Sequence, residues 1–558
     1  MTRLPLLFVL LLSGLFFACA PEKKYDLLIR NGLIYDGSGT TPYRGDIGII
    51  ADTIAFIGTA SVADADTVID AEGYAVSPGF INMLSWAGES LIIDGRSQGD
   101  ILQGVTLEVL GEGWSMGPLN DRLKTALKDE QAHMQYDVNW STLGEYLKML
   151  EKKGVSTNIA SFVGATTIRQ YVIGEDDRKP TLAELDSMRM LVRQAMEEGA
   201  LGVSTSLIYP PGFFASTEEL IELSKEAARY NGMYISHMRN EGNNLLEAVD
   251  ELFRISREAG IRAEIFHLKA AGKNNWWKID SIIARVEQAR AEGLPVSANM
   301  YLYTAGSTGL TAGLPPSLQN GGFGELWKRL QDPVIRQQMK AAMRSNPNDW
   351  DNLYYASGSA ENVLLLGFRT DSLRKYIGMN LARVAALRGA DPETTALNLI
   401  VQDSSSISVA FDMMSEENVR KQLQLPWMSF GSDAGSYSPE GIFLKASTHP
   451  RAYGNFARLI SNYVVKEKRM SLEETIRKLT SMPAENLKIT QRGRLKPGYF
   501  ADILVFKPEE IKDNATFDKP HQLAEGMQHV FVNGRQVVKA GKHTGALPGR
   551  VVKGPGAK

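Results

Sequence analysis

Two histidines stand at the ends of short apolar runs and are candidate metal ligands. The sequence contains seven histidines, and His237 and His267 each close such a run. Each is followed within two positions by a basic residue, Arg239 or Lys269. One histidine at a strand end is commonly a hydrogen-bonded core residue. Two at equivalent strand ends favour metal ligation, because neutral imidazole is the commonest protein ligand for zinc.

The elements that must position these histidines alternate between strands and helices. From about 78 to 487, short apolar runs ending in polar residues alternate with amphipathic helical stretches such as 217–231 and 279–292. This alternation predicts an α/β fold with a parallel sheet, and a (β/α)8 barrel carries its chemistry at the carboxyl ends of its strands. A doubly wound sheet would look similar locally, but no glycine-rich phosphate loop follows a strand. We therefore expect a (β/α)8 TIM-like barrel, with 311–400 as an insertion or lid over its mouth.

The two ends of the chain differ in texture from the middle. Residues 25–77 and 488–558 contain β-branched runs separated by turn sequences such as Asn31-Gly32. Neither end offers enough strands for an independent sheet. We therefore expect the two ends to pair in one small β-sandwich domain.

The first residues have the composition of an export signal. Arg3 precedes an apolar stretch that is too short to span a bilayer comfortably, and Cys19 follows Phe16-Phe17-Ala18. This segment resembles a bacterial lipobox, which predicts a signal peptide over 1–18, an acylated Cys19 and a tether over 19–24. An ordinary cleaved signal is the alternative. The prediction is an exported lipoprotein at the periplasmic face of a membrane, attached only through its lipid.

Composition narrows the possible partners. The formal net charge is −3, with 44% hydrophobic and 22% charged residues, which is ordinary for a globular protein. No basic stripe is present to neutralise phosphates, so we expect no nucleic-acid partner. Cys19 is the single cysteine, so an internal disulfide is excluded.

Several longer segments carry a specific resemblance. The chain resembles the N-acyl-D-amino-acid deacylase (D-aminoacylase) branch of the amidohydrolase superfamily, whose motifs occur here in the family's order. This resemblance implies hydrolysis of an amide bond in a small substrate that carries a carboxylate. The matching segments are GALGVSTSLIYPPG (199–212), SHMRNEG (236–242), FHLKAAG (266–272), YLYTAGST (301–308), FGSDA (430–434), HPRAYGNFARLI (449–460) and RGRLKPGYFADILVF (492–506).

Two departures from the family pattern concern the metal. The superfamily usually carries His-x-His after its first barrel strand, but PGFINMLSW at 78–86 places Leu84 and Trp86 there, and neither can bind a metal. Where the family has a ligating cysteine, a one-residue gap aligns Glu112. The resemblance then implies one divalent ion, zinc by preference, bound by Glu112, His237 and His267; the composition also suits iron or manganese. Alternatively, Glu112 forms an ion pair with a neighbouring basic side chain, either Arg239 or Lys269.

The resemblance also assigns a catalytic carboxylate. Asp433 lies in Gly-Ser-Asp-Ala-Gly, where an isolated aspartate is usually a turn or cap residue. In amidohydrolases this strand-end aspartate accepts the proton of the attacking water and delivers it to the leaving nitrogen. A carboxylate within hydrogen-bond reach can act as base and then acid in this way.

Substrate contacts follow from the same resemblance. Lys269, Tyr301 and Ser307 match positions that hold the substrate's α-carboxylate, and Tyr209 matches a residue near the carbonyl. Arg451 is either a carboxylate clamp or part of a structural ion pair. Lys269 has two alternative roles: an ion pair with the carboxylate at 112, or carboxylation as in the hydantoinase branch.

Three functions are compatible with these residues. The first is a metal-dependent amidase acting on N-acyl amino acids. The second is a cyclic amide hydrolase of the dihydroorotase or hydantoinase type, against which the segments at 199–212 and 301–308 weigh. The third is a binding lipoprotein that has lost catalysis together with its first-strand histidines.

Overall fold

The computed structural model describes residues 24–131 and 134–558. The predicted signal peptide, Cys19 and nearly all of the tether lie outside these residues. In the described part, no helix is long and apolar enough to cross a membrane.

Parallel strands form the centre of the molecule. One sheet has the strand order β17-β13-β12-β11-β10-β9 and a second has the order β6-β7-β8. Main-chain contacts join them at both edges: only Phe162 separates β8 from β9, and Met83 N donates to Phe430 O over 3.1 Å. The strands are β6 (Phe80–Asn82), β7 (Val105–Leu110), β8 (Asn158–Ser161), β9 (Val163–Gly164), β10 (Gly202–Ser206), β11 (Met233–His237), β12 (Arg262–Ile265), β13 (Val296–Met300) and β17 (Met428–Phe430).

Helices connect successive parallel strands. The expected helices at 217–231 and 279–292 are present as α7 and α9. Local signals fix helix ends: Thr181 and Glu184 form a capping box at the start of α6, and Gly199 ends it with φ +111°. The helices are α1 (Ser90–Ile93), α2 (Gln98–Ile101), α3 (Asp121–Glu130), α4 (Leu143–Lys153), α5 (Ala165–Val172), α6 (Leu182–Glu198), α7 (Thr217–Ala228), α8 (Leu245–Ala259), α9 (Lys278–Ala291), α16 (Arg451–Arg458), α17 (Leu472–Leu479) and α18 (Ser481–Asn486).

Apolar side chains cover both faces of these strands. One cluster, which includes Leu107, Val109, Ile235 and Phe266, gathers side chains from several of the parallel strands. A second and larger cluster lies between the strands and the surrounding helices. Burial on both faces is typical of parallel sheets, and every residue of β7, β10, β11 and β13 is buried here.

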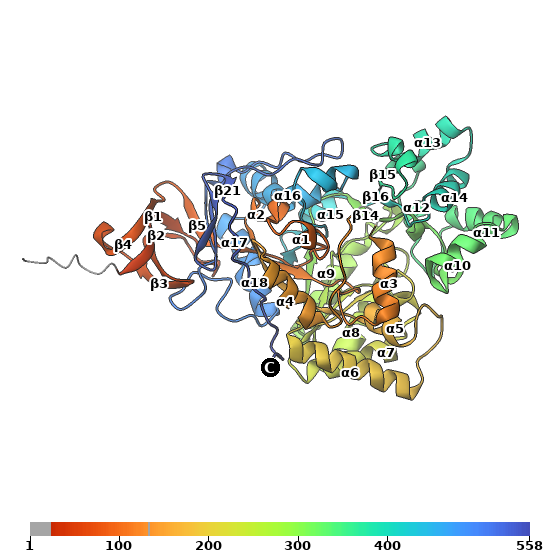
Figure 1. Cartoon of the computed structure of the whole chain (residues 1–558), viewed down its shortest axis with the longest axis horizontal. Helices are drawn as coiled ribbons and strands as arrows, with labels where there is room; N and C mark the ends of the chain where they lie inside the picture. The colour runs from red at the N-terminus through yellow and green to blue at the C-terminus, as the bar shows by residue number, and fades with distance from the viewer. Residues whose placement is uncertain (1–23, 132–133) are drawn as a thin grey trace, which may run out of the picture.

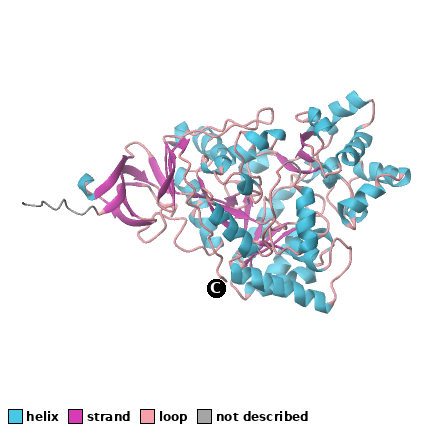
Figure 2. Cartoon of the chain, viewed as in Figure 1, coloured by secondary structure: helices cyan, strands magenta, loops and turns pink. Residues whose placement is uncertain are grey.

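Both chain ends contribute to one nine-stranded sheet (Figure 1). Val76 of β5 pairs with Val505 of β18, which joins the N-terminal strands to the C-terminal strands. Figure 2 shows these strands grouped at one end of the molecule. They are β1 (Tyr25–Ile34), β2 (Tyr43–Ile50), β3 (Thr53–Gly58), β4 (Ala65–Asp70), β5 (Ala75–Pro78), β18 (Ile503–Phe506), β19 (Met527–Val532), β20 (Arg535–Lys539) and β21 (Lys542–His543).

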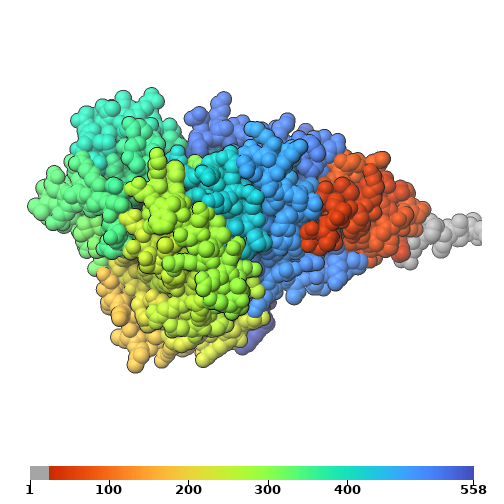
Figure 3. All heavy atoms as spheres, turned by 180° about the vertical axis from the view of Figure 1, so that it is seen from behind, coloured from red at the N-terminus to blue at the C-terminus, as the bar shows by residue number. Residues whose placement is uncertain are grey.

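A separate structural layer interrupts the parallel strands between β13 and β17. It has its own antiparallel sheet, in the order β14-β16-β15, and its own apolar core. It projects at the end of the molecule opposite β1–β4 (Figure 3). Its elements are β14 (Ala305–Gly309), β15 (Val363–Gly367), β16 (Ser408–Asp412), α10 (Gly322–Arg329), α11 (Pro333–Met343), α12 (Leu353–Ala356), α13 (Leu381–Arg388) and α14 (Pro392–Asp403). The next helix, α15 (Glu416–Gln422), belongs to the main core, where its Val419 is buried.

Candidate metal centre

Three predicted ligands come together at the carboxyl ends of three parallel strands. Glu112 follows β7, His237 ends β11 and His267 follows β12. Glu112 Oε1 lies 3.0 Å from His237 Nδ1 and 2.8 Å from His267 Nε2. All three residues are buried, and one potential ligand atom from each lies within 4.8 Å of the other two. The alternative pairing of Glu112 is not what the structure shows, since Arg239 pairs with Glu251.

The donor set fits one divalent ion. Three ligand atoms held about 2.1 Å from an ion in tetrahedral geometry lie about 3.4 Å apart. The spacings from Glu112 to the two histidines are close to this value, so small side-chain movements suffice to accommodate an ion. Two imidazoles and one carboxylate leave a coordination position open, as in hydrolytic zinc sites.

A second carboxylate, Glu241, lies behind the histidines. Glu241 Oε1 is 3.2 Å from His267 Nδ1, and its Oε2 is 3.6 Å from His237 Nε2. These are the ring nitrogens that face away from Glu112. Glu241 is close enough to His267 Nδ1 to help orient that ring, whereas His237 Nε2 has no hydrogen-bond partner among the described residues. Sequence reasoning missed this residue. The available signal was a carboxylate four positions after His237 in the segment SHMRNEG.

Lys269 lies on the same side of the histidines as Glu241. Its Nζ lies 2.7 Å from Glu241 Oε1 and 2.7 Å from His267 Nδ1. The side chain is buried, and both contacts of its amine lie on the side of the histidines that faces away from Glu112. The alternative prediction that Lys269 pairs with Glu112 is therefore wrong, because its amine pairs with Glu241.

The charges in this cluster alter the acidity of its members. Burial tends to raise the pKa of Glu112, but the charges and hydrogen bonds of His267 and His237 outweigh it and hold that pKa well below its usual range. Burial and Lys269 lower the pKa of His267, whereas Glu112 and Glu241 raise it, with a net rise to about 9. Without a metal ion, Glu112 and His267 therefore form a buried ion pair.

Asp433 lies on the other side of Glu112. It follows β17 and has φ +50°, and His267 has φ +33°. Left-handed backbone is rare for such residues and clusters at functional sites. Asp433 Oδ2 lies 2.8 Å from Arg451 Nη1. Burial raises the pKa of Asp433 and the positive charge of Arg451 opposes this rise, leaving the pKa above its usual value.

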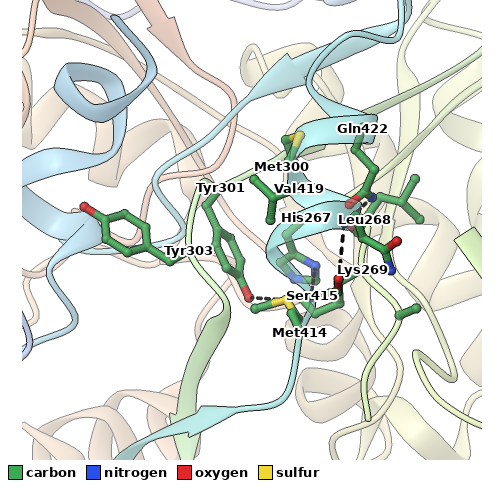
Figure 4. Close-up of a pocket in the computed structure, with 12 residues that line it drawn as sticks. His267, Leu268, Lys269, Met300, Tyr301, Tyr303, Met414, Ser415, Val419 and Gln422 are labelled. Carbon is green, nitrogen blue, oxygen red and sulfur yellow. Dashed lines mark hydrogen bonds between the residues drawn. The ribbon is translucent and has the colours of Figure 1, made fainter. Parts of the chain in front are cut away.

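The other predicted substrate residues surround the histidines unevenly. The Tyr209 ring lies 5.3 Å from the His237 ring, and the Arg451 guanidinium stacks 4.4 Å from the Tyr301 ring. Ser307 donates its hydroxyl to Val409 O over 3.0 Å. A pocket beside His267 is lined by Lys269, Tyr301 and residues of α15 and the segment before it (Figure 4).

Comparisons with known proteins identify the family. A model described as "Amidohydrolase family" matches residues 367–538. Over 535 residues the chain is 31% identical to a D-aminoacylase of Alcaligenes xylosoxydans xylosoxydans, covering 95% of this chain and 98% of the relative. The chain belongs to the D-aminoacylase family. The resemblance predicted from its sequence motifs is confirmed.

Solved D-aminoacylase-type structures share the architecture. N-acyl-D-glutamate deacylase from Bordetella bronchiseptica, complexed with zinc and a phosphonate mimic of the tetrahedral intermediate, matches with a TM-score of 0.79 and 28% identity, covering 95% of this chain and 100% of that chain. A D-aminoacylase structure with a binuclear metal centre, described by one-metal activation and second-metal attenuation, matches with a TM-score of 0.78 and 30% identity over the same shares.

This D-aminoacylase family member lacks the superfamily's His-x-His after its first parallel strand, β6. Leu84 is buried in the core, whereas the Trp86 side chain is 44% exposed. Trp86 Nε1 donates to Glu112 Oε2 over 2.8 Å and to Asp433 Oδ1 over 3.1 Å. Sequence reasoning recorded Trp86 only as a missing ligand, because its contact with Asp433 joins strands that are distant in the chain.

Proposed function

We propose that this chain hydrolyses N-acyl-D-amino acids with a single divalent metal ion, zinc by preference. The observation that carries this proposal is the cluster of Glu112, His237 and His267 with Asp433 beside it. D-aminoacylase similarity along nearly the whole chain supports the same substrate class. A divalent ion at these three residues would polarise the scissile carbonyl and lower the pKa of water.

The proposed scaffold is a closed (β/α)8 barrel in which β8 and β9 count as one interrupted strand. Contacts at both edges of the parallel sheets support closure, including the bridge between Ser85 and Ala434. We further propose that 25–77 and 488–558 form a β-sandwich domain and that the layer including 311–400 is an insertion over the barrel mouth. The shared nine-stranded sheet and the separate apolar core support these assignments.

Asp433 is the proposed catalytic proton carrier. Its carboxylate accepts a proton from the attacking water and delivers it to the leaving nitrogen. Burial raises the pKa of Asp433 above its usual value, while the positive charge of Arg451 opposes this rise. Because the site is largely buried, it limits the competing solvation of the reacting groups.

Arg451, Tyr301, Ser307 and Tyr209 are the proposed substrate contacts. Arg451 Nε has no hydrogen-bond partner among the residues that the structure describes, so it has a donor available for a carboxylate. Lys269 acts on the substrate only indirectly, because its amine contacts Glu241 and His267. Its carboxylation is not proposed, since the amine forms a short ion pair with Glu241.

The function is tested by assaying zinc-loaded protein with paired N-acetyl-D- and N-acetyl-L-amino acids, dihydroorotate and hydantoins. We expect hydrolysis of the N-acetyl-D compounds. Preferential opening of a cyclic amide would establish the second function instead. Saturable binding of N-acyl amino acids without turnover, in protein shown to hold metal, would instead establish a binding protein that has lost catalysis.

We also propose that the protein is exported and anchored by lipid at Cys19, on the periplasmic face of a membrane. The Phe16-Phe17-Ala18-Cys19 sequence and the preceding apolar stretch support this location. A small-molecule substrate is consistent with it, and we propose no nucleic-acid partner.

A further inference from the structure

The Trp86 indole occupies the space between two carboxylates of the site. Its Nε1 hydrogen is shared by Glu112 Oε2 at 2.8 Å and Asp433 Oδ1 at 3.1 Å. The other oxygen of each carboxylate faces elsewhere: Glu112 Oε1 faces the histidines, and Asp433 Oδ2 faces Arg451. The indole N–H therefore connects the proposed metal ligand to the proposed proton carrier.

The main chain holds Trp86 in this position from both sides. Trp86 N donates to Ala434 O over 3.0 Å, and the preceding residue, Ser85, donates its amide to Val109 O over 2.8 Å. Asp433 N in turn donates to Leu84 O over 2.8 Å. These bonds fix the Trp86 main chain between the ends of β7 and β17, while the residue as a whole is 44% exposed.

An indole N–H in this position has a defined electrostatic role. Two carboxylates that approach one another repel, and a shared donor offsets this repulsion. A cation between them would do the same, but indole offers only a donor and no lone pair for a metal. The structure also provides a positive charge for the far oxygen of Asp433, namely Arg451.

We propose that Trp86 replaces a second metal ion: its N–H positions Asp433 relative to Glu112, and its side chain offers no ligand atom, so the centre holds one ion per chain. This inference rests on the proposed function for the role of Asp433, but not for the metal count. Trp86 is a positioning residue, since it acts on the reaction through the two carboxylates. A relative with a binuclear centre has D-aminoacylase architecture, so the fold itself does not limit the site to one ion.

The first test counts metal without substrate. Wild-type protein incubated with excess zinc and then desalted should hold about one ion per chain by elemental analysis. The double variant Leu84→His/Trp86→His supplies two imidazoles at the first strand and should hold about two. Two ions in the wild-type protein, or one in a folded double variant, would overturn the proposal.

The second test observes the indole directly. In protein labelled with ¹⁵N-tryptophan, the indole N–H signal lost in Trp86→Phe belongs to Trp86. That signal should exchange slowly with solvent hydrogen and shift when zinc is added, because Glu112 Oε2 accepts the bond. A fast-exchanging signal that zinc leaves unmoved would contradict the bridge. Trp277→Phe is the matched control, since Trp277 is 62% exposed and should lose a signal that zinc does not affect.

The third test separates positioning from folding. Trp86→Phe keeps an aromatic side chain but removes the N–H donor, so it should retain one zinc and lower kcat about tenfold, with KM changed less than threefold. An unchanged kcat in a folded, zinc-loaded variant would show that the N–H does not position Asp433. If no variant or wild-type protein turns over any substrate, the metal counts and the indole signal still decide the proposal.

Discussion

Lys269 Nζ lies 2.7 Å from Glu241 Oε1, on the side of the histidines that faces away from Glu112. A carboxylate and a lysine therefore contact the His267 ring on the side away from Glu112. Asp351, from the layer inserted between β13 and β17, in turn accepts the backbone N–H of Glu241. The inserted layer thus helps to fix the loop that orients the centre.

Removing the charge of Glu241 should weaken metal binding. Outer contacts of this kind typically contribute 10- to 100-fold to metal affinity, so Glu241→Gln should lower zinc affinity by about that factor. Competition with a chromophoric chelator measures this change. Glu251→Gln is the control, because Glu251 pairs with Arg239 away from the cluster. Equal zinc affinity in Glu241→Gln and wild-type protein would show that Glu241 does not support the centre.

Ligand and proton-carrier variants should separate cleanly. Glu112→Ala should lose zinc as readily as His237→Ala, because each removes one ligand atom. Asp433→Asn should keep its zinc but lose amide hydrolysis by on the order of 10²- to 10⁴-fold, the usual contribution of general acid–base catalysis. Elemental analysis and steady-state kinetics measure both. Retention of tightly bound zinc by Glu112→Ala would remove Glu112 from the ligand set.

Zinc binding should release a proton below pH 9. Burial and Lys269 lower the pKa of His267, but Glu112 and Glu241 raise it further, to about 9. Only neutral imidazole binds zinc, so zinc affinity should rise with pH until about pH 9 and then level off. Calorimetry at pH 7 in buffers of different ionisation enthalpy should give about one released proton. The same apparent enthalpy in every buffer would contradict the ion pair.

The same pKa sets the sign of a stability effect in metal-free protein. The folded pKa of His267 exceeds its ordinary value of 6.5, so protonated His267 stabilises the fold. This contribution is fully present below pH 6.5 and is lost as pH rises through about 9. The free energy of unfolding of the zinc-free protein should therefore decrease over that window, relative to His267→Gln. Parallel pH profiles for the two proteins would exclude the effect.

Deleting residues 509–558 should destabilise both the end sheet and the parallel strands. The deletion removes β19–β21, and it also removes Gly549 and Val552, whose amides donate to Val155 O and Ile159 O. The truncated protein should be insoluble, as judged by fractionation after expression. Deleting only 555–558 should leave it soluble. A soluble, cooperatively unfolding 1–508 fragment would show that the two ends do not depend on each other.

Cys19→Ser should prevent lipid attachment while sparing the folded enzyme. We expect labelled fatty acid in the wild-type protein and none in the variant, with the variant released from membranes or retained as precursor. Catalytic constants should be unchanged, because Cys19 precedes the first strand. Wild-type protein that incorporates no labelled fatty acid would exclude the anchor.

The sequence predicted where the site residues lie in the fold better than it predicted which way their side chains point. His237 and His267 could be placed at strand ends because apolar runs mark where buried strands stop. Glu112 required an alignment gap, since nothing in its own neighbourhood distinguishes a ligand from a turn residue. Lys269 was expected to face the substrate, yet it faces Glu241. In a loop, side-chain direction follows from the backbone path and has no sequence period.

Contacts between distant segments were the least predictable. Trp86 and Asp433 are separated by 347 positions in the chain. Their hydrogen bond forms because Trp86 follows β6, Asp433 follows β17, and these two strands lie side by side. The sequence showed only that position 86 lacked a ligand. The contacts of Trp86 with Glu112 and Asp433 depend on how β7 and β17 lie beside β6, which the sequence does not show.

The pairing of Val76 with Val505 also has a consequence for synthesis. A ribosome makes β5 early, but its antiparallel neighbour only after nearly the whole chain has emerged. Until then, the edge of β5 offers unpaired backbone groups to other chains. Such long-range pairing is slow to form, so completion of this sheet follows translation of the last strands.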